Sequence, residues 1–157
     1  MDKSATQWMV EPLKKYATFS GRARRKEYWW FQLFVILLTL LALAADVMIN
    51  GLDAMIAGAT GYVEAVVSLA LFLPSVGVSV RRLHDTDRRG WWLLMPLLPA
   101  LILGGAAGAM AVGVEGAGKW MAAGGLLLAI TSVLLLVWYC SRGTIGENRF
   151  GPDPIAE

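Results

Sequence analysis

The sequence predicts an all-α polytopic membrane protein, a helical bundle of four transmembrane helices with an N-terminal amphipathic interfacial helix. Of its 157 residues, 57% are hydrophobic, and the mean hydropathy of +0.56 lies above that of an ordinary soluble domain. The apolar residues fall into four blocks, each close to the ~20 helical residues that cross a bilayer. Basic residues gather in alternate connecting segments, as expected of a chain that crosses a membrane several times.

The N-terminal segment, residues 1–28, is expected to lie along the membrane surface and to lead into the first span. Met9, Leu13 and Tyr16 recur at helical spacing, with two lysines beside them. This is the pattern of an amphipathic helix at a membrane interface. Further on, Glu27 is placed to pair with an arginine about one helical turn away.

Four spans are expected at residues 29–49, 62–80, 91–112 and 120–140. Each begins with Trp or Tyr, whose amphipathic ring suits the level of the lipid headgroups. Residues 141–157 form a turn-rich tail that we expect to dock on the same face as the N-terminal segment. The whole chain, residues 1–157, is therefore predicted to be a single membrane domain.

Several residues within the spans have structural consequences. The first span ends near Asp46, which we expect to be solvated at the outer surface. Pro74 in the second span removes a backbone donor, so a hydroxyl or a neighbouring helix is expected to satisfy the freed carbonyl. Gly104 and Gly108 form a G-x-x-x-G motif in the third span, which predicts close approach of another helix. A second stripe of small residues surrounds Gly125 in the fourth span.

The fourteen Lys and Arg residues are divided very unevenly between the two sides of the membrane. Seven precede the first span, four lie in the loop after the second span and two lie in the tail, whereas only Lys119 lies on the other side. The positive-inside rule therefore places both termini and the central loop in the cytoplasm. Because topology accounts for this charge, we expect no nucleic-acid partner.

The first span has one alternative interpretation. Ala42-Leu43-Ala44, followed by Ala45, resembles a signal-peptidase site. The polar and basic segment before the apolar run is long for a signal peptide, so we favour an uncleaved span. The single cysteine, Cys140, excludes an intramolecular disulfide.

The stretch from Arg81 to Trp92 is the only dense polar run between the apolar blocks, and it carries the only histidine. The predicted topology brings it to the same face as the N-terminal segment and the tail. On a helical extension of the second span, Arg81 and Asp85 are four residues apart and are expected to meet. The candidate site consists of Arg22, Arg25, Glu27, Arg81, Arg82, His84, Asp85, Asn148 and Arg149.

Two interpretations of this candidate site remain open. Arginine–carboxylate pairs, bridged by Asn148 and the His84 ring, would lock the tail, the loop and the N-terminal segment together. Alternatively, the same arginines would bind an anionic lipid headgroup, another ligand or a protein partner, because the guanidinium fork fits carboxylates and phosphates.

Three stretches of the chain resemble a known family. They are Phe19-x-Gly21-Arg22-x-x-Arg25-x-Glu27-Tyr28-Trp29, then Arg81-Arg82-Leu83-His84-Asp85 with Gly90-Trp91, and finally Gly146-x-Asn148-x-Phe150-Gly151-x-Asp153-Pro154. In order and spacing these stretches are similar to the DUF805 family, and the resemblance extends from Lys14 to Pro154. It implies a small multi-pass protein of the bacterial inner (plasma) membrane and brings no assigned activity. One departure is Asp87-Arg88-Arg89, where smaller or less charged residues are expected.

Three classes of function are weighed. The favoured one is a non-enzymatic membrane protein whose candidate site locks the helices or binds a partner. The alternative, an oligomeric small transporter or channel, usually needs ionisable groups near the midplane, which the spans lack. The third, a membrane enzyme acting on a phosphorylated or lipid substrate, would use His84 and Asp85 as acid and base.

The sequence contains no motif for a cofactor, and its single histidine and single cysteine do not make a typical metal site. The partners that we expect are therefore the lipid bilayer, anionic headgroups within it, and another membrane protein or a second copy of the chain.

Overall fold

The computed structural model describes residues 4–154 and is built of helices. Their bounds are α1 Ala5–Lys14, α2 Arg25–Asn50, α3 Leu52–Ile56, α4 Tyr62–Asp85, a 3₁₀ helix η1 Gly90–Leu94, α5 Leu97–Ala111 and α6 Ala117–Cys140. By length and composition, four segments can cross a membrane: Arg25–Asn50, Tyr62–Asp85, Gly90–Ala111 and Ala117–Cys140. The predicted all-α fold with four spans is confirmed.

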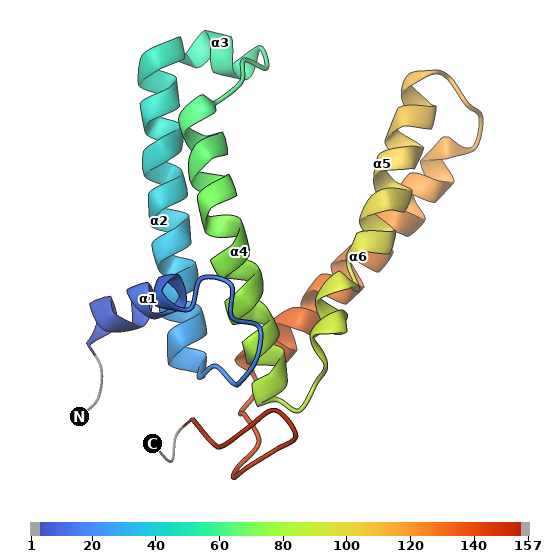
Figure 1. Cartoon of the computed structure of the whole chain (residues 1–157). Coiled ribbons are helices and arrows are strands. Elements are labelled where there is room, and N and C mark those ends of the chain that lie inside the picture. The colour runs from blue at the N-terminus through green and yellow to red at the C-terminus, as the bar shows by residue number, and fades with distance from the viewer. Residues whose placement is uncertain (1–3, 155–157) are drawn as a thin grey trace.

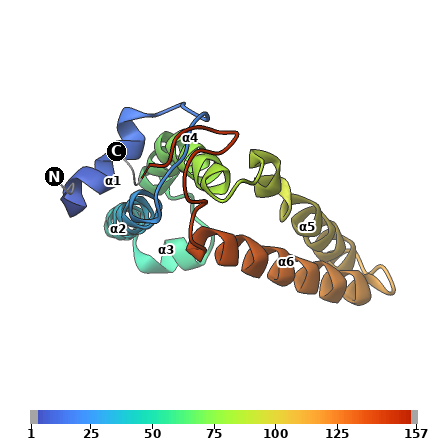
Figure 2. The same cartoon turned by 90° about the horizontal axis from the view of Figure 1, so that it is seen from below.

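The four long helices form two hairpins that meet at one end and diverge at the other (Figure 1). Helix α2 pairs with α4, and α5 pairs with α6. The view from below shows the α5–α6 hairpin extending away from the rest (Figure 2). The helix α1, the loop after α4 and the tail all lie near the closed end, where the hairpins meet (Figure 1).

The buried core lies at this closed end. Tyr28 of α2 stacks on Tyr139 of α6 with ring centroids 4.5 Å apart, and Phe31, Val78 and Leu83 are buried around them. Along the diverging arms, most apolar side chains are exposed, which is the pattern of helices that face lipid. Contact between the hairpins therefore depends on a small region.

Helix α1 begins with a capping box, in which the Ser4 hydroxyl accepts from the Gln7 backbone and the Gln7 side chain accepts from the Ser4 backbone. It lies across α2 and α4 rather than along them (Figure 1), and Trp8 and Pro12 are buried. The Arg24 guanidinium lies 5.8 Å from the centroid of the Trp8 ring. A cation–π contact of this kind holds α1 against the segment that leads into α2.

Helix α4 extends past Val80, so the polar residues from Arg81 to Asp85 are helical. The helix ends in a Schellman motif, in which the Asp87 N–H donates to the His84 carbonyl and the Arg88 N–H donates to the Leu83 carbonyl. Asp87 has φ 55°, the left-handed conformation that this motif requires. This turn directs the chain from α4 into η1.

The carbonyl freed by Pro74 is satisfied as predicted. Pro74 lies inside α4 and cannot donate to the carbonyl of Ala70. The Tyr16 hydroxyl donates to that carbonyl instead, at 2.6 Å. The next residues of this segment approach α4 at Gly77, where an added Cβ would lie 3.2 Å from the Thr18 carbonyl oxygen. The segment after α1 is therefore docked on the proline-containing turn of α4.

Asp46 is not solvated, and that expectation is wrong. It is 1% exposed, and its two carboxylate oxygens accept from the backbone N–H groups of Val63 and Glu64, at 3.0 and 2.7 Å. These donors belong to the first turn of α4, which has no side-chain cap of its own. Asp46 of α2 therefore caps α4 and ties the two helices together at the open end.

The glycines that make close helix contact differ from those predicted. A Cβ added at Gly104, Gly108 or Gly125 would meet nothing within 4 Å in the described chain. At Gly124 it would lie 2.9 Å from the backbone nitrogen of Leu103. Helices α5 and α6 thus approach one another at Gly124, because that position faces the partner helix.

We expect Tyr16→Phe to lower the free energy of unfolding by about 1 kcal/mol, since the Ala70 carbonyl loses its donor. In a Pro74→Ala background, residue 74 regains an N–H that can donate to Ala70, so the same change should cost less. Unfolding of the four proteins in detergent measures this coupling. An equal cost of Tyr16→Phe in both backgrounds would contradict the assignment.

Candidate functional site at the closed end

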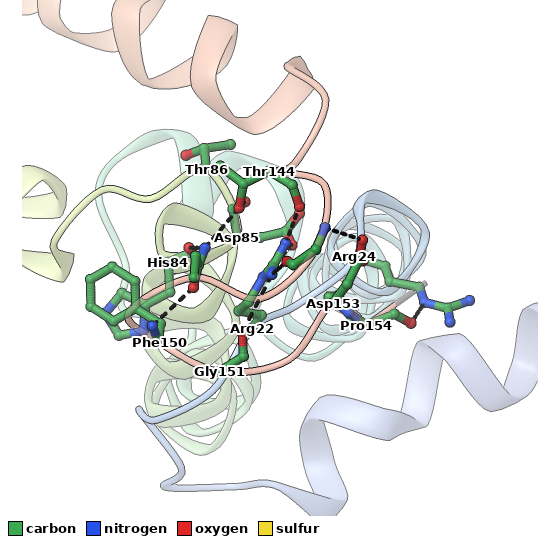
Figure 3. Close-up of polar contacts among 12 residues, drawn as sticks. Arg22, Arg24, His84, Asp85, Thr86, Thr144, Phe150, Gly151, Asp153 and Pro154 are labelled. Carbon is green, nitrogen blue, oxygen red and sulfur yellow. Dashed lines mark hydrogen bonds and ion pairs between the residues drawn. The ribbon is translucent and has the colours of Figure 1, made fainter. Parts of the chain in front are cut away.

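Three segments distant in the sequence converge at the closed end: the residues that precede α2, the last turn of α4 and the tail (Figure 3). The buried charged side chains of these segments, together with Glu27 in the first turn of α2, form what we call the polar junction. It consists of Arg22, Glu27, Arg81, Arg82 and Asp85. All five belong to the candidate site predicted from the sequence.

Asp85 is the centre of the polar junction. Its Oδ1 accepts from Nε of Arg22 at 3.0 Å and lies 3.0 Å from Nη2 of the same side chain. Its Oδ2 accepts from Nη1 of Arg82. The side chains of Arg22, Arg82 and Asp85 are 1%, 0% and 6% exposed. One carboxylate therefore compensates two buried guanidinium groups.

Arg22 also fixes the path of the tail. Its Nη1 donates to the Gly146 carbonyl at 2.6 Å, and its Nη2 donates to the Thr144 carbonyl at 2.5 Å. The Thr144 backbone N–H in turn donates to the Asp85 carbonyl at 2.8 Å. These bonds, part of the network drawn in Figure 3, satisfy backbone groups of a segment that has no regular secondary structure.

Arg82 connects α4 to the end of α6. Its Nε donates to the Tyr139 carbonyl at 3.1 Å, and its Nη2 donates to the Ser141 carbonyl. The last carbonyls of a helix lack intrahelical partners and carry partial negative charge, so a guanidinium is well suited to this place. Arg82 therefore caps α6 and joins the two hairpins.

Arg81 does not meet Asp85, and that expectation is wrong. Its Nη2 lies 3.2 Å from Oε1 of Glu27 in α2, and its Nη1 donates to the Thr18 carbonyl. Asp85 is reached instead by Arg82, three residues before it on the helix. Glu27 was expected to pair with an arginine one helical turn away. It pairs instead with Arg81 of α4, because the two side chains are buried against one another.

His84 packs against the tail. Its ring stacks on Phe150 with centroids 3.9 Å apart and planes within 3° (Figure 3), and its Nδ1 lies 3.1 Å from the Gly21 carbonyl. Asn148 donates to the His84 carbonyl at 2.9 Å and to the Thr144 hydroxyl at 2.8 Å. His84 and Asp85 therefore have separate partners and do not form an acid–base pair.

Like His84 and Asn148, the two remaining predicted members, Arg25 and Arg149, lie outside the polar junction. Arg25 is exposed and donates to the Cys140 carbonyl at 3.3 Å. Arg149 pairs with Asp87 at 3.0 Å, where both side chains are about half exposed. Such a surface pair contributes little to stability.

Several contacts of this site were not predicted from the sequence, although Asp153 lies in one of the family motifs. Gly143 is required at its position because any Cβ would overlap the Asp85 carboxylate. Arg24 donates to the Pro154 carbonyl and so fixes the end of the described tail (Figure 3). Asp153 accepts from the Gly146 N–H at 3.0 Å and closes the tail on itself. These roles depend on where the folded tail lies against the segment before α2 and against the end of α4.

The four apolar helices and the charged residues buried where they converge define a polytopic membrane protein. The chain belongs to the family described as "Protein of unknown function (DUF805)", whose model matches residues 16–152. The resemblance seen in the three sequence stretches is thereby confirmed.

Curated relatives cover nearly the whole chain. The inner membrane protein YhaH of Escherichia coli is 37% identical over 96% of this chain and 98% of its own length. The inner membrane protein YhaI of the same organism is 35% identical over 94% of this chain and 95% of its own length. A further relative, the uncharacterized protein YiiR, is 31% identical over 87% of this chain and 85% of its own length. No solved structure matches the chain.

We expect Asp85→Asn to lower the free energy of unfolding by about 3–5 kcal/mol, because Arg22 and Arg82 would remain buried without a countercharge. The matched control is Asp87→Asn, two residues away, where the exposed pair with Arg149 accounts for about 0–1 kcal/mol. Denaturant unfolding in detergent measures both changes. Similar losses in the two variants would contradict the central role of Asp85.

Proposed function

We propose that the chain is a non-catalytic protein of the bacterial inner membrane in which the polar junction acts as a lock. The lock holds the two hairpins at a fixed angle and leaves their apolar faces open toward the bilayer, where a membrane partner or lipid binds. The observation that carries this proposal is the convergence of two buried arginines, from different segments, on the single carboxylate of Asp85.

The lock accounts for the geometry better than an anion site at the same residues. Arg22 and Arg82 already donate to Asp85 and to backbone carbonyls of the tail and α6. Their side chains are almost fully buried, so a phosphate could reach them only by displacing the tail. The loss of these bonds would leave buried polar groups unsatisfied, which is costly.

The other two classes of function, a membrane enzyme and a small transporter or channel, have less support. An enzyme would need a working acid or base, and the Asp85 carboxylate is held between two arginines instead. An ion-coupled transporter would need an accessible ionisable group within its spans. Asp46 is fully buried in α2, but both its oxygens cap α4.

The closed end faces the cytoplasm in this proposal. The described basic residues before α2, after α4 and in the tail are grouped at that end, whereas Lys119 lies near the start of α6 at the open end. Positive charge is retained on the cytoplasmic side of membrane proteins. The relatives YhaH and YhaI are named inner membrane proteins, which supports the same membrane for this chain.

Single cysteines in a Cys140→Ser background test this orientation. Ile145 in the tail and Val114 between α5 and α6 are both well exposed. We expect a membrane-impermeant maleimide to label Val114→Cys in intact spheroplasts. Ile145→Cys should be labelled only after the membrane is permeabilised. The reverse pattern would overturn the proposed topology.

The lock itself is tested by the distance between the hairpin tips. Spin labels at Asp53→Cys and Val114→Cys, again without Cys140, should give one narrow distance distribution in lipid nanodiscs. Adding Asp85→Asn should broaden or shift the distribution, because the described parts of the two hairpins meet only at the closed end. Adding Asp87→Asn should leave it narrow. A distribution unchanged by Asp85→Asn would show that the junction does not set the angle.

A further inference from the structure

An open groove of about 730 Å³ lies beside the polar junction, bordered by α4, η1 and the tail. Its walls are mainly apolar and include Val76 and Val80 of α4, Trp91 and Leu94 of η1, and Phe150 of the tail. Ligand-binding pockets commonly have volumes of about 300–1,000 Å³. None of the described residues that line the groove is acidic. The groove therefore suits a ligand with a large apolar part.

Arg89 gives this groove a positive charge. Among the arginines of the central loop, Arg81 and Arg82 are buried in the polar junction. Arg88 lies 4.6 Å from the centroid of the Trp138 ring and donates to the Thr86 carbonyl at 3.1 Å. Arg89 is exposed and lines the groove, and its side chain makes no hydrogen bond, ion pair or ring contact with any residue of the described range 4–154. Its five donors are available to a ligand.

The groove lies at the boundary between polar and apolar parts of the chain. Trp91 is 76% exposed and is the second residue of the apolar segment that begins at Gly90. Tryptophan in such a position marks the level of the lipid headgroups. Val76 lies farther along α4 from the closed end than Val80, so the apolar wall extends toward the acyl-chain region. The stacked rings of His84 and Phe150 form part of the polar end (Figure 3).

We propose that this groove binds one anionic phospholipid of the surrounding bilayer. Arg89 donates to the headgroup phosphate, and an acyl chain lies along Val76 and Val80. Charge complementarity selects an anionic headgroup, because the only charged side chain in the lining that is free of protein partners is Arg89. The site goes beyond the lock, since none of the arginines of the polar junction takes part, and it does not depend on which end faces the cytoplasm.

Native mass spectrometry of the full chain released from detergent tests the site. The probes are phosphatidylglycerol and phosphatidylcholine with identical acyl chains, which differ only in headgroup. We expect one phosphatidylglycerol to be retained in preference to phosphatidylcholine. Arg89→Ala should weaken phosphatidylglycerol binding about fivefold, the typical effect of one basic residue near an anionic lipid surface, without changing thermal stability.

Two further variants separate the groove from general surface charge. Arg142→Ala removes another exposed arginine that is free of described partners but lies outside the groove lining, and it should change binding less than twofold. Val76→Phe narrows the groove and keeps Arg89, and it should also weaken binding. Equal losses in Arg89→Ala and Arg142→Ala would overturn the site. Equal retention of both lipids by the unaltered protein would also overturn it. Binding that is unchanged in both Arg89→Ala and Val76→Phe would do the same.

Discussion

Asp85 is the residue on which the arrangement of this membrane protein depends. Two guanidinium groups that are almost completely buried share its carboxylate, and each also donates to backbone carbonyls of another segment. Burying charge in this way is favourable only when the charges are paired and the remaining donors are satisfied. Both conditions are met here. Through Arg22 and Arg82, Asp85 therefore joins the N-terminal segment, α4, α6 and the tail.

The same constraint explains the other polar contacts. In a chain surrounded by lipid, a backbone group without a partner is especially costly. Tyr16 supplies a donor to the carbonyl that Pro74 leaves free, Asp46 supplies acceptors to the first turn of α4, and Arg82 caps the end of α6. Polar side chains therefore act mainly on the backbone of a neighbouring segment, and each such bond also fixes how two segments lie against one another.

This use of polar groups separates the arginines of the central loop into different roles. Arg81 and Arg82 are buried in the polar junction, and Arg88 stacks on an aromatic ring of α6. Only Arg89, of these four, remains available at the described surface. The proposed lock would hold the walls of the nearby groove in place, so the proposed lock and the proposed lipid site are compatible with one another.

The sequence by itself determined the four spans, the all-α class, the family and a set of nine candidate residues that contains the five of the polar junction, because hydropathy, span length and motifs are local properties of the chain. Only the tertiary structure decided which charges pair. Arg81 meets Glu27, 54 residues away, rather than Asp85 on its own helix, and Asp46 is buried rather than solvated. Gly124, rather than Gly104 or Gly108, allows close helix contact. Which residues pair or make close contact depends on how the helices are rotated and packed against one another. The spacing of residues along one helix does not contain that information.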